Sequence, residues 1–235
     1  MKNNLFRFKK FEVLQSNDVF KIGTDAVLLG AATNCENVDT ILDVGCGTGV
    51  IALMLAQKSR AMIYAIDINP AAYELTKQNV ANSAFANRIK IFESSLQDFS
   101  PEIKFDLIVS NPPYFSSGII APDKNRALAR HDIGLCPDDF VINSIRLLSD
   151  NGRIAVILPE KQSEEFTIRC LNAGLNLRSK LIIYPKEGMD PVRTITEMSR
   201  YESDVVIKSV TIERNKRHEY TEDYRKLTAD YYLKF

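Results

Sequence analysis

The stretch ILDVGCGTGVIALMLAQ (41–57) joins an apolar run, a glycine-rich turn and a longer apolar segment. Its first four residues predict a buried strand and its last eight predict a helix. Between them, Gly45, Gly47 and Gly49 permit a tight turn and let the backbone approach a ligand without a Cβ in the way. A glycine turn between a strand and a helix is the context in which this motif indicates a nucleotide-like ligand.

The same alternation continues outward from this stretch. Further strands are predicted at 62–67, 89–93, 105–110 and 153–159, and helices at 26–32, 70–84, 137–148 and 163–173. Three strands without helices then follow, in LNLRSKLIIYP, VRTITEMSRY and DVVIKSVTIE. For this order we predict a doubly wound α/β fold with a seven-stranded, mostly parallel sheet and an antiparallel edge, although eight runs have strand character. Class I (Rossmann-like) methyltransferases and dehydrogenases both have such a layout.

The two ends of the chain add smaller elements. Residues 1–22 predict a β-hairpin with its turn at Ser16-Asn17-Asp18, and Thr24-Asp25 predicts the start of a short capped helix. Residues 202–235 predict a strand and a basic, tyrosine-rich tail. With 235 residues, of which 45% are hydrophobic, we expect one methyltransferase-sized domain over 1–235.

Composition narrows the function classes. No apolar run reaches the roughly 20 residues that span a bilayer, and no secretory signal is visible, so we expect a cytoplasmic protein without a membrane partner. Four scattered cysteines and two histidines suggest neither a metal site nor a disulfide framework. The 30 basic and 30 acidic residues balance, which argues mildly against a nucleic-acid partner unless the basic residues cluster. The sequence does not indicate the oligomeric state.

An acidic residue follows the glycine turn at the spacing expected of a nucleoside site. Asp67 ends the next predicted strand, 18 residues after Gly49, where a carboxylate can accept hydrogen bonds from ribose hydroxyls. The glycine spacing is G-x-G-x-G, preceded by Asp43, and an acidic residue there suits a methionine ammonium group and would repel a diphosphate. We therefore favour S-adenosylmethionine over a dinucleotide. The alternative is a glycine turn that only packs the helix on the strand.

The fourth predicted strand runs into the tetrapeptide Asn111-Pro112-Pro113-Tyr114. Ligands of doubly wound sheets bind beyond the carboxyl ends of strands, so this turn falls beside the glycine turn. The Asn111 amide oxygen and the Pro112 carbonyl could each accept one N–H of a planar amine, and the prolines fix both acceptors in place. Tyr114 offers a face for stacking a base. The alternative is a proline turn with an incidental tyrosine.

The two motifs together resemble class I methyltransferases that modify the 6-amino group of adenine or the side-chain amide of glutamine. Three further stretches resemble the bacterial tRNA1(Val) adenine-37 N(6)-methyltransferase family, and the resemblance covers essentially the whole chain. They are VFKIGTDAVLLGA (19–31), RALARHD (126–132) and YTEDYRKLTADYYLKF (220–235).

This resemblance implies an enzyme that methylates adenine 37 in the anticodon stem-loop of a valine tRNA. It implies catalytic roles for Asn111, Pro112 and Tyr114, which would hold the target adenine. The residues it implies for S-adenosylmethionine are Thr24, Asp25, Asp43, Gly45, Gly47, Gly49, Asp67, Ile68, Ser95, Leu96 and Asn111. Ser95 stands where related enzymes often carry an aspartate for the cofactor's adenine, and the Leu96 backbone or Asp98 are the alternatives for that contact.

Two basic clusters are candidates for phosphate contacts. They consist of Lys124, Arg126, Arg130 and His131 near the tetrapeptide, and of Arg214, Lys216 and Arg217 near the C-terminal end. The second cluster is interleaved with Tyr220 and Tyr224, which could stack on unpaired bases. The alternative for each cluster is an ordinary solvated charged surface.

Three other functions compete with tRNA methylation. A glutamine N(5)-methyltransferase acting on a release factor would use the same tetrapeptide, but that family carries a helical N-terminal domain for which this chain has no room. A DNA adenine methyltransferase would need a recognition domain that we do not find. A non-catalytic RNA-binding module would have no need of both intact motifs.

Overall fold

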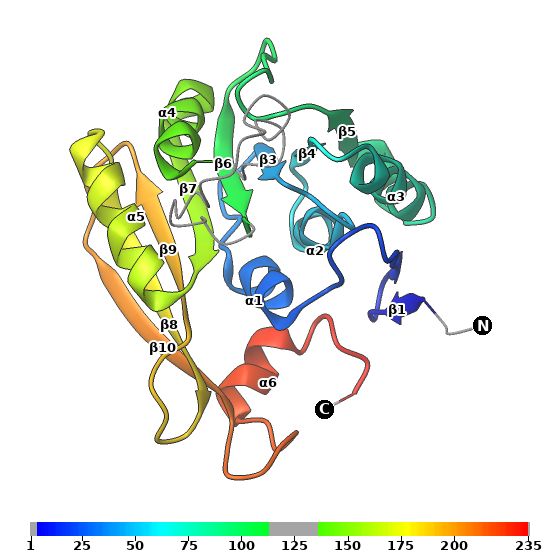
Figure 1. The fold of residues 1–235 in the computed structure, drawn as a ribbon, viewed down its shortest axis with the longest axis vertical. Helices are drawn as coiled ribbons and strands as arrows, with labels where there is room; N and C mark the ends of the chain where they lie inside the picture. The colour runs from blue at the N-terminus through cyan, green and yellow to red at the C-terminus, as the bar shows by residue number, and fades with distance from the viewer. Residues whose placement is uncertain (1–3, 113–135, 235) are drawn as a thin grey trace, which may run out of the picture.

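The computed structural model describes residues 4–112 and 136–234. Eight strands form its central sheet, in the order β10-β8-β9-β7-β6-β3-β4-β5 (Figure 1). In chain order these strands are β3 (Thr40–Val44), β4 (Met62–Asp67), β5 (Ile89–Glu93), β6 (Phe105–Ser110), β7 (Leu148–Leu158), β8 (Asn176–Lys186), β9 (Arg193–Ser199) and β10 (Val206–Glu213). The predicted α/β class with a mostly parallel sheet is confirmed.

The far end of the sheet differs from the prediction. The sheet has eight strands instead of seven, because β10 pairs in parallel with β8 and covers its outer edge. Only β9 runs antiparallel to its neighbours, and it lies inside the sheet between β7 and β8. The expected antiparallel edge is therefore wrong: β8 and β9 form a hairpin, and the chain then passes back to add a strand in the parallel direction.

Helices cover both faces of the sheet (Figure 1). One face carries α1 (Thr24–Ala32), α2 (Val50–Lys58) and α3 (Pro70–Ala81), and the other carries α4 (Pro137–Leu147) and α5 (Glu160–Asn172). Strand β6 shows why both faces need cover. Its Leu107 and Val109 pack into the cluster under α1 and α2, while Ile108 packs under α4 and α5. Helix α2 is apolar all round because it is enclosed: its residues 50–56 are all buried.

Some helix and strand limits differ from those predicted. Asn69 caps α3 as expected, its side chain accepting a hydrogen bond from the backbone N–H of Ala71 at 2.9 Å. By contrast, α1 begins at Thr24 itself, with Gly23 as the preceding cap residue and no side-chain capping bond. Residues 150–152, which separate the predicted helix 137–148 from the predicted strand 153–159, lie inside β7, next to a register shift against β6. A short 3-10 helix, η1 (Ala86–Arg88), precedes β5.

The N-terminal hairpin exists, but its turn is earlier than expected. Strands β1 (Leu5–Arg7) and β2 (Glu12–Leu14) pair antiparallel. The turn between them is closed by a hydrogen bond from the N–H of Phe8 to the carbonyl of Phe11 at 2.9 Å, and the two rings stack with centroids 4.7 Å apart. Burial of these rings decides the turn, whereas the polar residues 16–18 belong to an irregular segment that leads to α1.

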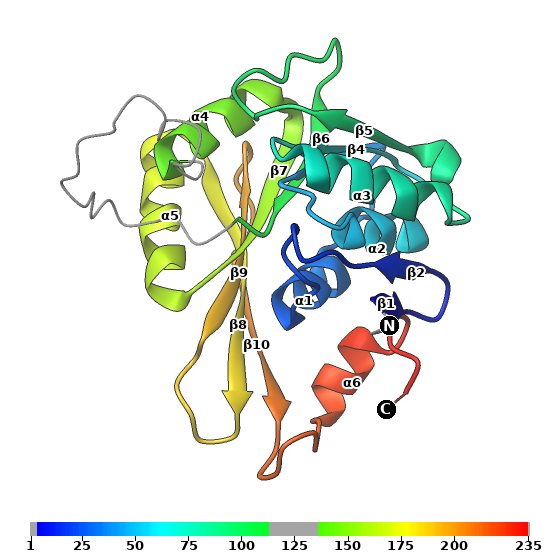
Figure 2. The ribbon, with the colours of Figure 1, turned by 45° about the vertical axis from the view of Figure 1, so that its right-hand side comes forward.

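The C-terminal end folds back onto this hairpin (Figures 1 and 2). Helix α6 (Glu222–Thr228) is capped by Thr221, whose side chain accepts a hydrogen bond from the N–H of Tyr224 at 3.2 Å. Beyond the helix, Tyr232 forms an antiparallel bridge with Phe8, and the N–H of Lys9 donates to the carbonyl of Tyr231 at 2.8 Å. The predicted basic tail is thus a folded part of the domain.

Candidate active site

The chain order reverses at β3, which creates a topological switch point in the sheet. From β3 the chain proceeds outward through β4 and β5, and then returns to place β6 on the other side of β3. Crevices for ligands form at such points, outside the carboxyl ends of the strands. The glycine turn follows β3, and Asn111 and Pro112 follow β6, so the described parts of both predicted motifs lie at this point.

All three glycines of the turn adopt left-handed backbone conformations. The φ angles are +73° at Gly45, +57° at Gly47 and +76° at Gly49. A Cβ added at Gly49 would come within 2.8 Å of the Thr76 Cγ2 atom, so this position needs glycine for space as well as for conformation. A Cβ at Gly45 would meet nothing within 4 Å and would project into open space. Gly45 is therefore the position of the turn that leaves open space beside its backbone.

Asp67 joins the glycine turn to the end of β4. Its two carboxylate oxygens accept hydrogen bonds from the N–H groups of Gly47 and Asn69, each at 2.9 Å. The Asp67 backbone carbonyl in turn accepts from the N–H of Ser94, which follows β5. These hydrogen bonds hold the carboxylate beside the glycine turn in one orientation. Ile68, the next residue, has an exposed side chain.

Asp43 is fully buried beneath the turn. One carboxylate oxygen accepts from the N–H of Ala52 at 3.1 Å, while the other, Oδ1, has no hydrogen-bond partner among the described residues. Burial raises the pKa of Asp43 to about 7, and the Ala52 bond opposes this increase only partly. A buried acceptor without a donor is costly, so the site favours a ligand that brings one.

The register of β3 and β6 brings the second motif beside the first. Val44 is the partner of Ser110, and the Ser110 hydroxyl donates to the Val44 carbonyl at 2.9 Å. Asn111 therefore leaves β6 at the level where Gly45 leaves β3, with the two strands about 4.8 Å apart. Asn111 is half-buried and Pro112 is buried. Tyr114 lies outside the described residues.

The sequence comparisons agree with this geometry. The chain matches the methyltransferase small domain family over residues 7–173. A protein of Parabacteroides distasonis named tRNA1(Val) (adenine(37)-N6)-methyltransferase is 41% identical over 100% of both chains. A protein of the same name from Histophilus somni is 37% identical over 100% of this chain and 99% of the relative. The chain belongs to this methyltransferase family.

Solved structures share the fold of the methyltransferase at low sequence identity. A predicted O-methyltransferase from Agrobacterium tumefaciens superposes with a TM-score of 0.66 at 19% identity, over 88% of this chain and 96% of the other. The tRNA m1G37 methyltransferase of M. jannaschii superposes with a TM-score of 0.61 at 16% identity, over 86% of this chain and 59% of the other. At these sequence identities, the similarity shows a shared fold.

The turn after β5 carries the predicted Ser95 and Leu96. The Ser95 hydroxyl donates to Asp98 at 2.6 Å, and Leu96 is buried. Arg146 on α4 was not predicted: one of its guanidinium nitrogens lies 3.0–3.3 Å from the carbonyl oxygens of Leu96, Gln97 and Phe99. The sequence offers no signal for Arg146, because a surface arginine late in a helix is common.

Two polar residues on the buried side of α3 were also missed. Thr76 donates to the Gly47 carbonyl at 2.8 Å. The amide of Asn79 donates to the carbonyls of Thr48 and Leu14 and accepts from the N–H of Leu14 at 2.8 Å, which ties β2 to the glycine turn. Their i, i+3 spacing places both on one helix face, and a polar pair on an otherwise buried face was the available signal.

The remaining predicted residues are distributed unevenly. Asp25 forms an ion pair with Arg193 at 2.8 Å, linking α1 to the start of β9, and Thr24 is exposed. Lys124, Arg126, Arg130 and His131 lie outside the described residues.

The basic residues Arg214, Lys216 and Arg217 are exposed in the turn between β10 and α6. Tyr224 is only 2% exposed, so the expectation that it could stack on a base is wrong. Its ring instead packs against Tyr220, with centroids 5.2 Å apart.

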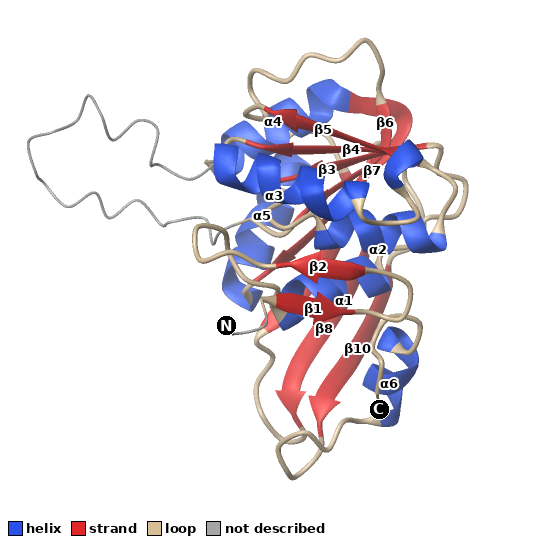
Figure 3. Ribbon diagram, turned by 90° about the vertical axis from the view of Figure 1, so that its right-hand side faces the viewer, coloured by secondary structure: helices blue, strands red, loops and turns tan. Residues whose placement is uncertain are grey.

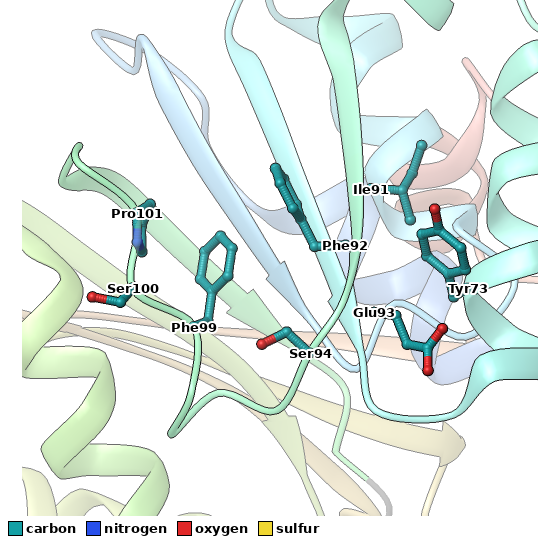
Figure 4. A pocket seen from close by; sticks show the side chains of 8 residues that line it. All are labelled: Tyr73, Ile91, Phe92, Glu93, Ser94, Phe99, Ser100 and Pro101. Carbon is teal, nitrogen blue, oxygen red and sulfur yellow. The ribbon is translucent and has the colours of Figure 1, made fainter.

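A hollow of about 570 Å³ lies at the free edge of β5. Figure 4 shows Tyr73 and Glu93 on one side of this strand and Phe99 and Pro101 on the other. Among residues 4–112 and 136–234, no three His, Cys, Asp or Glu side chains are grouped to hold a metal ion. No helix in the described chain is long and apolar enough to cross a bilayer.

Proposed function

We propose that the enzyme transfers a methyl group from S-adenosylmethionine to the 6-amino nitrogen of adenine 37 in a tRNA, the reaction in its relatives' names. The observation that carries the proposal is the pairing of Val44 with Ser110, which sets Asn111 beside the glycine turn. One motif suits a nucleoside-containing cofactor and the other suits a planar amine. Their adjacency is what a direct transfer between the two ligands requires.

The residues around the turn suit S-adenosylmethionine. The Asp43 Oδ1 atom lacks a donor that a methionine ammonium would supply, and the space beside Gly45 is open. Asp67 would hold the ribose hydroxyls, and Ile68 and the 95–96 turn would flank the cofactor's adenine. Thr24 and Asp25 would cover the site from α1. When bound, S-adenosylmethionine supplies a methyl group on a positively charged sulfur.

The protein's part in the reaction is to prepare the amine. The exocyclic nitrogen of adenine is a poor nucleophile because its lone pair is delocalised into the ring. The Asn111 side-chain oxygen and the Pro112 carbonyl would each accept one N–H, which localises the lone pair. Two consecutive prolines keep both acceptors in place. Tyr114 would stack on the base, and the surplus proton leaves after transfer.

A tRNA substrate also needs contacts beyond the reacting base. We assign these to the exposed Arg214, Lys216 and Arg217 and to Lys124, Arg126, Arg130 and His131, which would meet phosphates of the anticodon stem-loop. The whole chain would act as one domain in the cytoplasm, where tRNA is modified.

The proposal is tested with the purified full chain, S-adenosylmethionine and unmodified tRNA1(Val) transcripts. We expect N6-methyladenosine in the digested transcript by mass spectrometry, and none when guanine replaces adenine 37. Methylated glutamine in a release factor, with no methylation of the transcript, would contradict the proposal. Total tRNA from a deletion strain and its parent gives the corresponding test in cells.

A further inference from the structure

The segment 15–23, between β2 and α1, is held across the carboxyl edge of the sheet. At its start, the side chain of Gln15 accepts a hydrogen bond from the N–H of Ile22 at 3.0 Å. The amide of Asn69 donates to the Asp18 carbonyl at 3.4 Å, next to Asp67. Figure 3 shows this segment on the side of the molecule where β4 and β5 end. It is therefore fixed at the rim of the proposed active site.

Within this segment, Val19 and Phe20 have opposite surroundings. Val19 is 7% exposed, and its Cγ1 atom is 3.9 Å from the position that a Cβ on Gly47 would occupy. Phe20 is 84% exposed, the largest value among the exposed large hydrophobic residues of the described chain. Val19 thus lies against the glycine turn, while the ring of the next residue, Phe20, faces solvent.

A single exposed hydrophobic side chain is ordinary on a protein surface. Phe20 differs in two respects: its backbone is anchored on both sides, and the next residue, Lys21, is an exposed cation. An aromatic face beside a positive charge is the combination with which proteins bind single-stranded nucleic acid, through base stacking and phosphate attraction. The ring is thus available and positioned before any ligand arrives.

We propose that Phe20 is a stacking surface for an unpaired base of the tRNA, with Lys21 contacting the adjoining phosphate. This inference rests on the proposed function and adds a residue that recognises its substrate. It places one nucleotide of the substrate loop against the 15–23 segment, on the α1 side of the glycine turn.

The test compares Phe20→Ala, Phe20→Leu and Phe20→Trp in the full chain. We expect the alanine variant to bind tRNA1(Val) transcript about tenfold more weakly, the scale of one base stacked on a ring. Leucine keeps the apolar bulk without the ring face and should lose as much, whereas tryptophan should retain binding. The dissociation constant for S-adenosylmethionine should stay within about twofold for all three. Ile168→Ala, at a 58% exposed site on α5, is the matched control and should change neither.

Three results would overturn the proposal. They are unchanged tRNA binding by the alanine variant, full binding by the leucine variant, and a loss of S-adenosylmethionine affinity as large as that for tRNA. The wild-type protein separates this inference from the proposed function. If wild-type enzyme methylates the transcript and Phe20→Ala behaves identically, only the role of Phe20 fails. If wild-type enzyme neither binds nor methylates tRNA, the proposed function itself fails.

Discussion

The switch point of the sheet and the contact between the chain ends differ in backbone conformation and in hydrogen bonding. At the switch point the glycines have positive φ angles and Asp43 keeps a buried oxygen without a donor. Where the hairpin meets α6, the backbone is paired through Phe8 and Tyr232, and Tyr224 is buried. A buried group without a partner requires an explanation, and at Asp43 a ligand that completes it is one. From this difference we infer that the switch point holds the proposed site and that the contact between the chain ends supports the fold. Both regions carry conspicuous sequence motifs.

The largest expected effect tests the supporting role of the chain ends. Tyr224→Ala should lower the free energy of unfolding by about 3–5 kcal/mol, the usual cost of removing a buried aromatic ring. Denaturant unfolding measures this change. Leu233→Ala, at a nearby 54% exposed position, should cost less than about 0.5 kcal/mol. If the Tyr224→Ala protein were stable but bound tRNA more weakly, the tyrosine would have a role in RNA binding and not in stability.

At the switch point, Asn111→Ala should act on the reaction and leave the fold intact. Removing one preorganised polar contact of this kind costs about 10²–10³ in rate. Single-turnover methylation of tRNA measures the rate, and calorimetric titration with S-adenosylmethionine should show nearly unchanged cofactor affinity. Asn172→Ala, at the exposed end of α5, should leave both quantities unchanged. Equal losses of cofactor binding and rate would remove Asn111 from the role of amine acceptor.

Two glycine variants distinguish effects on stability from effects on cofactor binding within a single turn. Gly49→Ala should lower the free energy of unfolding by about 2 kcal/mol or more, because strain at positive φ adds to the contact with Thr76. Gly45→Ala has the strain alone and should cost about 1–2 kcal/mol, while its methyl group enters the cofactor space. Gly188→Ala, with φ +77° and open surroundings, controls for strain. We expect Gly45→Ala, but not Gly188→Ala, to weaken S-adenosylmethionine binding.

The raised pKa of Asp43 predicts a pH dependence of stability. Its value is about 7 in the folded protein and near 3.8 ordinarily, so the folded state binds the extra proton between these pH values. The free energy of unfolding should therefore fall as pH rises from about 4 to 7, by at most about 1.4 kcal/mol per pH unit. Asp43→Asn should remove this component in denaturant titrations at several pH values. An identical slope in the variant would mean that other groups cause it.

The smallest effect concerns the exposed turn after β10. Replacing Arg214, Lys216 and Arg217 together with alanine should raise the Michaelis constant for tRNA and reduce its salt dependence, with stability unchanged. Steady-state kinetics at two salt concentrations measures both. An unchanged Michaelis constant for tRNA would mean that other basic residues make the phosphate contacts.

The sequence predicted the positions of the two motifs better than their surroundings. Asp67 and Asn111 could be placed because strand ends in a parallel sheet meet at one edge, and strands are recognisable locally. The hairpin turn was misplaced because the stacking of Phe8 on Phe11 outweighs the turn preference of residues 16–18. Likewise, Asn79 acts through three contacts with segments that only the tertiary fold brings together.

The bridge between Phe8 and Tyr232 also affects how the protein is made. During translation, the first strands leave the ribosome more than 200 residues before the segment that pairs with them. The nascent hairpin must wait, without its partner, until Tyr232 has been synthesised. A tag attached next to Tyr232 would consequently disturb the hairpin of β1 and β2 as well as the segment that follows α6.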